Sequence, residues 1–128
     1  MDEFGEYVPC ATYFHDSDCV EYVKHDAFVI YDRVDEFLTL IFDKTAKNLV
    51  GFKLKGFKNI FTKQLAPMFK LNDKQFLRLV SAIEAICVQI GDDLSRDEVR
   101  RKSYQDAAAM AANDNVQLSG HHMQRLAA

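Results

Sequence analysis

The distribution of aromatic residues divides this chain near residue 72 and strongly limits what it can fold into. Fourteen of the fifteen Phe and Tyr residues lie within residues 4–76, and only Tyr104 lies beyond them. Alanine is enriched in the second part, above all in residues 107–112. Aromatic and β-branched residues favour strands, whereas alanine favours helices. We therefore expect an α+β fold, in which an antiparallel sheet is followed by helices packed on one face.

Four segments of the first part have the composition and alternation of strands: residues 19–24, 27–32, 36–43 and 49–55. The connections between them are too short for the crossovers of a parallel sheet. His25-Asp26 is typical of a tight connection, and the polar residues 44–48 indicate a hairpin loop. These patterns predict an antiparallel β-meander of about four strands over residues 19–56.

Two or three helices are predicted after the sheet. A short helix begins near Asn59 and ends before Pro67, because proline interrupts a helix. A longer helix has Asn72 as its N-cap, apolar residues at helical spacing over residues 76–90, and Gly91 as its C-terminal cap.

A capping box formed by Ser95 and Glu98 opens the last predicted helix, whose apolar face is thin and rich in alanine. The run Asn-Asp-Asn at residues 113–115 ends this helix. We assign residues 1–112 to a single α+β domain and residues 113–128 to a short helix or flexible tail.

The phases of the predicted strands and of the first long helix select an expected core. Its members are Val20, Phe28, Ile30, Leu38, Leu40, Phe42, Phe52 and Leu54 from the sheet, with Phe76, Leu79, Val80, Ile83, Cys87 and Ile90 from the helix. The segment 36–43 is apolar on both phases, so we expect both of its faces to be covered.

The length and composition fit one soluble domain. The chain has 128 residues, of which 48% are hydrophobic. No apolar run approaches the roughly 20 residues of a membrane-spanning helix. The first residues, MDEFGEYVP, lack the basic and apolar regions of a secretory signal. Three cysteines, an odd number, fit a reducing compartment better than a disulfide framework, so we expect a cytoplasmic protein.

The net charge of −3 hides a division into three unlike segments. Residues 1–43 carry eleven acids against two bases, which gives −9. Residues 44–74 carry eight lysines against one acid, which gives +7, and residues 75–128 carry seven acids and six bases, which gives −1. Segments of opposite charge attract each other, either within the chain, with Glu36 and Asp43 near the lysine-rich strand, or between two subunits.

Four residues of metal-ligand type gather near the start of the chain: Cys10, His15, Cys19 and His25. Their spacing, C-x4-H-x3-C-x5-H, lacks the closely spaced pairs of a structural zinc site. His15 and His25 each precede an Asp, as in some metal-dependent phosphohydrolases, but neighbours on a strand point to opposite sides. We therefore expect no metal, no cofactor and no catalytic residue, with a small metal-dependent hydrolase or nuclease as an alternative.

Lysines with interleaved aromatic residues lie within the last strand pattern and directly after it. Lys53, Lys55, Lys58 and Lys63 are candidates for binding nucleic acid or another anionic partner. Phe52 lies on the strand phase opposite to Lys53 and Lys55, which favours a place for its ring in the core. A nucleic-acid-binding regulator is therefore the second interpretation.

The favoured interpretation is a small non-enzymatic interaction or regulatory protein that binds another protein. Its support is two surfaces that need cover, the two-sided apolar strand and the alanine-faced helix. The candidate interface residues are Phe37, Ile41, Tyr104, Ala107 and Ala111. Because one chain carries both surfaces, we expect a homodimer.

Residues 31–56, YDRVDEFLTLIFDKTAKNLVGFKLKG, resemble small bacterial domains of unknown function. The resemblance lies in a Tyr-Asp strand end, a nearby Asp, an apolar strand and a later Val-Gly strand. It implies a hairpin of this kind in a bacterial protein, and it implies no activity.

Overall fold

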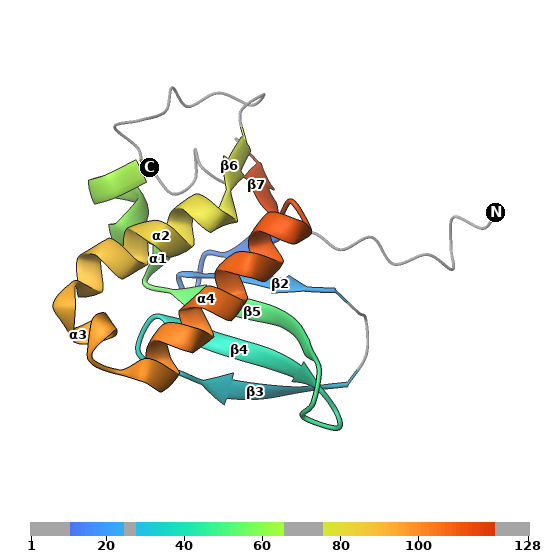
Figure 1. Ribbon diagram of the computed structural model, residues 1–128. Coiled ribbons are helices and arrows are strands. Elements are labelled where there is room, and N and C mark those ends of the chain that lie inside the picture. Colours follow the sequence, from blue (N-terminus) through green and yellow to red (C-terminus); the bar gives the residue numbers. More distant parts are fainter. Residues whose placement is uncertain (1–10, 25–27, 66–75, 120–128) are drawn as a thin grey trace.

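The computed structural model describes residues 11–24, 28–65 and 76–119. Five antiparallel strands form one sheet in the order β1-β2-β5-β4-β3 (Figure 1). These strands are β1 (Thr12–Phe14), β2 (Cys19–Val23), β3 (Val29–Arg33), β4 (Leu38–Asp43) and β5 (Leu49–Lys55). Helices follow the sheet along the chain, so the predicted α+β fold is confirmed.

The strand order differs from the expected sequence of neighbours at one point. β3, β4 and β5 form a meander, but β2 pairs with β5 and not with β3. In this register Val20 lies opposite Leu54 and Tyr22 opposite Phe52, with the two aromatic rings 5.7 Å apart. Apolar pairs of this kind stabilise a central pair of strands. β3 is left at the edge of the sheet.

Gly51 is the residue that permits the close approach of β2 to β5. A β-carbon at this position would lie 2.1 Å from the carbonyl oxygen of Tyr22. The neighbouring Val50 forms an irregularity in the pairing of β4 and β5, where Ile41 faces Gly51 and Phe42 faces Leu49. Glycine in a strand interior commonly marks such an approach.

Most of the described helical residues belong to α2 (Leu79–Ile90) and α4 (Glu98–Asn113), and both lie on the same side of the sheet (Figure 1). The shorter elements are α1 (Phe57–Ile60), the π-helix η1 (Phe61–Leu65) and α3 (Asp92–Ser95). α2 ends at Gly91, as predicted. Among the described residues, no helix is long and apolar enough to cross a membrane.

The start of α4 corrects the predicted capping box. Ser95 belongs to α3, and the N-cap of α4 is Asp97, whose side chain accepts a hydrogen bond of 3.0 Å from the backbone N–H of Arg100. Ser and Asp are both favoured N-cap residues, and only Ser95 has a Glu three residues later, so the sequence favoured Ser95. The turn of α3, closed by Leu94, determines which one caps the helix.

Two short strands correct the predictions on either side of the helices. β6 (Phe76–Arg78) lies inside the predicted helix, so α2 begins only at Leu79. β7 (Gln117–Ser119) lies where a short helix or flexible tail was predicted. The two strands pair, and Leu77 and Leu118 face each other fully buried. This pairing joins segments that are distant in sequence, and it outweighs local helix propensity. Asn72 and Pro67 lie outside the described residues.

The core lies between the sheet and α2 with α4. The strands contribute the alternate residues that face the helices, and α2 contributes its apolar stripe. The predicted members that are buried are Val20, Leu38, Leu40, Phe52, Leu54, Leu79 and Ile83, while Phe42, Val80, Cys87 and Ile90 pack partly buried against them. Phe28 and Ile30, also predicted for the core, are exposed instead.

Candidate functional site

Exposed apolar side chains gather at the edge strand β3, and the most exposed large one among the described residues lies directly before it. Phe28, directly before the strand, is 90% exposed, Tyr31 is 53% exposed and Ile30 is 40% exposed. The core prediction for Phe28 and Ile30 is wrong because β2 pairs with β5 and leaves no strand outside β3. An apolar edge strand of this kind is a surface for another chain.

Three of the five residues of β3 direct their backbone groups away from the sheet. Val34 donates its N–H to the carbonyl of Leu38 at the hairpin end. Antiparallel pairing alternates along a strand, so Asp32 and Ile30 also direct their backbone groups toward β4. Val29, Tyr31 and Arg33 therefore direct their N–H and C=O groups outward. We call these outward groups the β3 edge.

A buried carboxylate fixes α4 beside this strand. Asp35, in the turn between β3 and β4, accepts backbone hydrogen bonds from Phe37 (2.8 Å) and Leu38 (2.7 Å). Its side chain also accepts hydrogen bonds of 2.7 Å from Arg100 Nε and from the Tyr104 hydroxyl. The Asp35 side chain is only 8% exposed.

These donors keep Asp35 ionised. Burial raises the cost of its charge, but the hydrogen bonds from Tyr104, Leu38, Arg100 and Phe37 outweigh that cost and lower the pKa of the carboxyl below its usual value. The hydrogen bond to Asp35 raises the pKa of Arg100. Burial and Asp35 together raise the pKa of Tyr104 far above its usual value. The cluster is thus an ion pair with a neutral phenol.

A hollow of about 230 Å³ lies between the C-terminal end of β3 and the start of α4. We call it the Val99 hollow. Its lining residues are Asp32, Arg33, Val34, Asp97, Val99, Arg100 and Ser103. Val99 is 79% exposed, although it is apolar. The Asp35–Arg100 contact holds the wall that α4 contributes.

The face of the sheet opposite α2 and α4 carries charged and aromatic side chains. We call it the open face, and the strand registers assign to it Thr12, Phe14, Cys19, Glu21, Val23, Tyr31, Arg33, Thr39, Ile41, Lys53 and Lys55. Tyr31 donates a hydrogen bond of 3.1 Å to Glu21, and Lys53 Nζ lies 5.2 Å from the centre of the Tyr31 ring. Because β4 and β5 separate β3 from β2, the Tyr31 side chain extends across both strands.

The predicted lysines divide into two groups. Lys53 and Lys55 lie half-buried on the open face, whereas Lys58 in α1 and Lys63 in η1 are exposed beyond the end of β5. Lys53 is neighboured in the register by Glu21 and Thr39. The structure therefore places the first pair together on a sheet face.

The predicted interface residues are largely covered by the chain itself. Tyr104, Ala107 and Ala111 are at most 2% exposed, because α4 packs through them against α2 and the sheet. Ile41 is fully buried on the open face beside Tyr31, and Phe37 is partly buried. Small side chains on α4 serve close internal packing, so this stripe is not exposed to a partner.

The candidate ligand residues are only partly described. Cys10 and His25 lie outside the described residues, as does Asp26. Cys19 is buried, and His15 is exposed beside Asp16 at 3.9 Å. Within the described ranges no group of three potential ligands approaches metal-binding distance.

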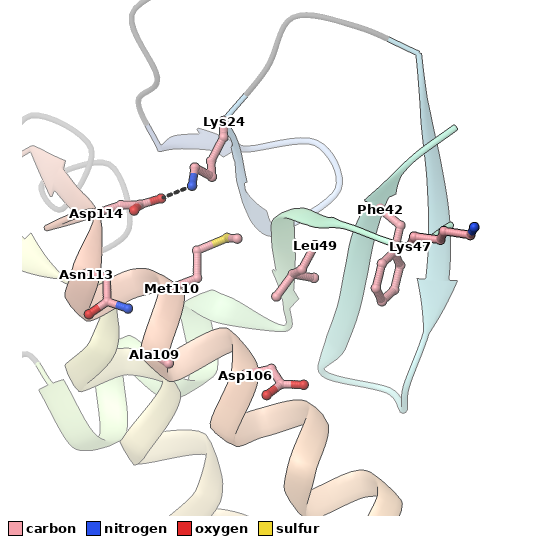
Figure 2. A pocket seen from close by; sticks show the side chains of 9 residues that line it. All are labelled: Lys24, Phe42, Lys47, Leu49, Asp106, Ala109, Met110, Asn113 and Asp114. Carbon is pink, nitrogen blue, oxygen red and sulfur yellow. Dashed lines mark ion pairs between the residues drawn. The ribbon is translucent and has the colours of Figure 1, made fainter. Parts of the chain in front are cut away.

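A further hollow, of about 410 Å³, separates the β4–β5 hairpin from the C-terminal half of α4 (Figure 2). Its charged groups already have ion-pair partners or point outward, and Asp106 pairs at 3.2 Å with Lys102, which does not line the hollow. Asp114 lies 3.8 Å from Lys24 and accepts a hydrogen bond of 2.8 Å from the Tyr22 hydroxyl. Lys47 points away from the hollow in Figure 2. These contacts fasten the end of α4 to the sheet.

Cys87 lines an apolar groove of about 280 Å³ between α2 and α4. Burial raises the pKa of its thiol, which keeps the sulfur protonated at neutral pH. It therefore has the inert character expected of a small apolar side chain.

No family model, no curated protein and no solved structure matches this chain.

Sequence reasoning did not identify the β3 edge, Phe28 or the Val99 hollow. One local signal was present. Ile30 and Asp32 occupy the same strand phase, and an acid on the helix-facing side is typical of an edge strand whose end reaches solvent.

Proposed function

We propose that this chain is a small non-enzymatic interaction protein, which binds another protein chain by accepting an extended segment at the β3 edge. The observation that carries the proposal is the combination, on one edge strand, of outward backbone groups and exposed apolar side chains. In strand addition, main-chain hydrogen bonds supply affinity and side-chain contacts supply specificity.

The two sides of β3 offer different contacts to an incoming strand. Ile30 faces the side of the helices, opposite Phe42, whereas Tyr31 faces the open side. An added segment with an apolar residue next to Ile30 would extend the apolar surface that begins at Phe42. The charge of Arg33 at the end of the strand favours an acidic residue in the same segment.

The experiment selects extended peptides from a random displayed library on the native chain and measures their affinity for two variants. Val29→Pro removes one outward N–H without breaking the pairing to β4, whereas Val29→Thr keeps this N–H and is the matched control. We expect Val29→Pro to weaken binding at least ~10-fold and Val29→Thr to leave it nearly unchanged. Peptides that bind Val29→Pro as tightly as the native chain would refute strand addition at β3.

A second candidate function, binding of single-stranded nucleic acid, has one specific observation in its favour. Two exposed aromatic side chains, Phe14 and Tyr31, share the open face with Lys53 and Lys55. Bases stack on aromatic rings and the backbone is attracted to cations, so this combination suits an unpaired strand. Glu21 opposes it, since its carboxylate lies among these groups.

Fluorescence anisotropy with single-stranded DNA and RNA oligonucleotides tests this candidate. The combined change Lys53→Glu and Lys55→Glu should abolish binding. The combined change Arg96→Glu and Lys102→Glu, at exposed positions beside and on α4, is the charge-matched control. Binding should also weaken steeply as salt is added. No binding by the native chain at low salt would remove this function.

A further inference from the structure

We propose that the segment which pairs with the β3 edge is β3 of a second copy of this chain, antiparallel about a two-fold axis at Tyr31. This inference rests on the proposed function and names its partner. It also assigns a role to Phe28 and the Val99 hollow, which lie near opposite ends of the same strand.

Symmetry leaves few registers for such a pair. A two-fold axis perpendicular to the sheet places the helix-facing sides of both copies on the same side of the joined sheet. Two residues that lie opposite each other must therefore point to the same side. Side chains alternate between faces along a strand, and the axis must therefore pass through a single residue position. The central positions of β3 are Ile30, Tyr31 and Asp32.

Charge distinguishes these three registers. An axis at Asp32 places this carboxylate opposite its own copy, which is unfavourable. An axis at Ile30 places the ring of Phe28 opposite the carboxylate of Asp32. An axis at Tyr31 opposes no like charges. It places the smaller Ile30 opposite Asp32, and it places the large Phe28 ring of one copy opposite the apolar Val34 of the other.

The register at Tyr31 also satisfies the backbone. The outward groups belong to Val29, Tyr31 and Arg33, and this register places Tyr31 opposite itself and Val29 opposite Arg33. These are hydrogen-bonded pairs of an antiparallel ladder. The two sheets then join into one continuous sheet, and the helices of both copies lie on the same side of it.

Phe28 and the Val99 hollow are complementary in this arrangement. Val34 lines the hollow and shares the helix-facing side of β3 with Phe28. Phe28 of one copy, placed opposite Val34 of the other, therefore meets a hollow of about 230 Å³ beside Val99. Asp35 holds the guanidinium of Arg100 in the wall of the hollow. A cation at this place attracts the face of an aromatic ring through a cation–π interaction. The two-fold axis repeats this contact.

The composition of β3 leaves most of this strand open to pairing. Edge strands are commonly protected by lysine, by proline or by an inward-pointing charge. β3 contains neither lysine nor proline, and its one helix-facing charge is Asp32. β1, at the other edge of the sheet, has only three residues. β3 is therefore the longer edge of the five-stranded sheet.

Sedimentation equilibrium measures the association. The native chain should form a dimer, and Phe28→Ala should raise the dimer dissociation constant roughly 30-fold or more, because two symmetric contacts are lost. Phe28 is 90% exposed, so its replacement leaves the fold intact. Val88→Ala, on α2 and 73% exposed, is the matched control and should not change the dissociation constant.

Cysteine scanning tests the register. Single variants Ile30→Cys, Tyr31→Cys and Asp32→Cys are made in a chain with Cys10→Ser and Cys87→Ser, while the buried Cys19 is retained. About the axis at Tyr31, position 31 lies ~5.5 Å from its copy, within disulfide range, whereas positions 30 and 32 lie ~8 Å from theirs. Only Tyr31→Cys should crosslink under mild oxidation.

The outcomes separate this inference from the function on which it rests. A native chain that stays monomeric, while selected peptides still require the N–H of Val29, refutes the second copy and leaves strand addition standing. A dimer that survives Val29→Pro refutes the pairing of two β3 strands, and peptides that also bind this variant as tightly as the native chain refute strand addition itself. Crosslinking at position 30 or 32 in preference to 31 overturns the proposed register.

Discussion

Replacement of Asp35 by asparagine is the sharpest test of how the fold is held together. Asp35 accepts four hydrogen bonds of 2.7–2.8 Å, from two backbone N–H groups, Arg100 and Tyr104. Asparagine keeps the shape but retains one acceptor oxygen, and its NH2 group faces donors. Hydrogen bonds to a charged group contribute about 1.5–3 kcal/mol each, and Arg100 is partly exposed, so we expect a loss of about 3 kcal/mol of unfolding free energy.

The effect of pH gives this prediction a second, independent reading. The folded-state pKa of Asp35 lies below the ordinary value of 3.8, so the unfolded chain takes up the proton first as the pH falls. The stabilisation by Asp35 is therefore complete above the unfolded pKa and is lost as the pH falls through the folded pKa. The difference in unfolding free energy between the native chain and Asp35→Asn should be constant from about pH 7 to pH 5 and should shrink below about pH 4.

Urea unfolding followed by circular dichroism, at pH 7, 5 and 3, measures both effects. Asp93→Asn is the control, because Asp93 is 77% exposed and its ion pair with Arg96 spans 3.9 Å at the surface. If Asp35→Asn lowers the unfolding free energy by less than about 1 kcal/mol at pH 7, the four hydrogen bonds to Asp35 do not stabilise the fold as we expect. A difference that stays the same size at pH 3 would show that ionised Asp35 is not its source.

Four further substitutions test the packing and the cap of α4 by the same urea assay. Gly51→Ala should cost about 2–3 kcal/mol, because its β-carbon meets the carbonyl oxygen of Tyr22; an unchanged midpoint would contradict this approach. Asp97→Ala should lower the unfolding free energy by about 1 kcal/mol and Ser95→Ala by much less. The reverse order would mean that Ser95 caps α4, as the sequence predicted. Leu118→Ala should cost about 2–5 kcal/mol, because this fully buried side chain belongs to the core; a neutral effect would mean that β7 is dispensable.

The parts of the fold that follow from local pattern were predictable. The alternation in residues 49–55 and the polar loop before them are local, and both the strand and its hairpin with β4 are present. The end of α2 at Gly91 depends only on the conformation of one residue. Pairing between distant segments was not predictable in this way, as β6 with β7 and β2 with β5 show.

The candidate site could not be predicted for the same reason. Phe28 and Ile30 have the composition of core residues, and only the insertion of β5 between β2 and β4 leaves them exposed. Conversely, the alanine stripe of α4 was interpreted as a surface that needs a partner. It is already covered, because small side chains let α4 pack closely against α2 and the sheet.

The division of charge along the chain acquires a different meaning in three dimensions. The acidic first segment is not matched mainly by the lysine-rich strand, where Lys53 adjoins Glu21. Its most buried acid, Asp35, pairs instead with Arg100 of α4, and Glu36 lies 3.4 Å from the same guanidinium.

The ion pair of Asp35 with Arg100 binds the sheet to the helical part of the chain and also shapes the Val99 hollow. One contact therefore stabilises the fold and prepares the surface that we assign to a second copy. The lysine-rich segment carries its cations on the open face and on α1 and η1, where they are half-buried or exposed, whereas the most buried carboxylate of the acidic segment is enclosed in the fold.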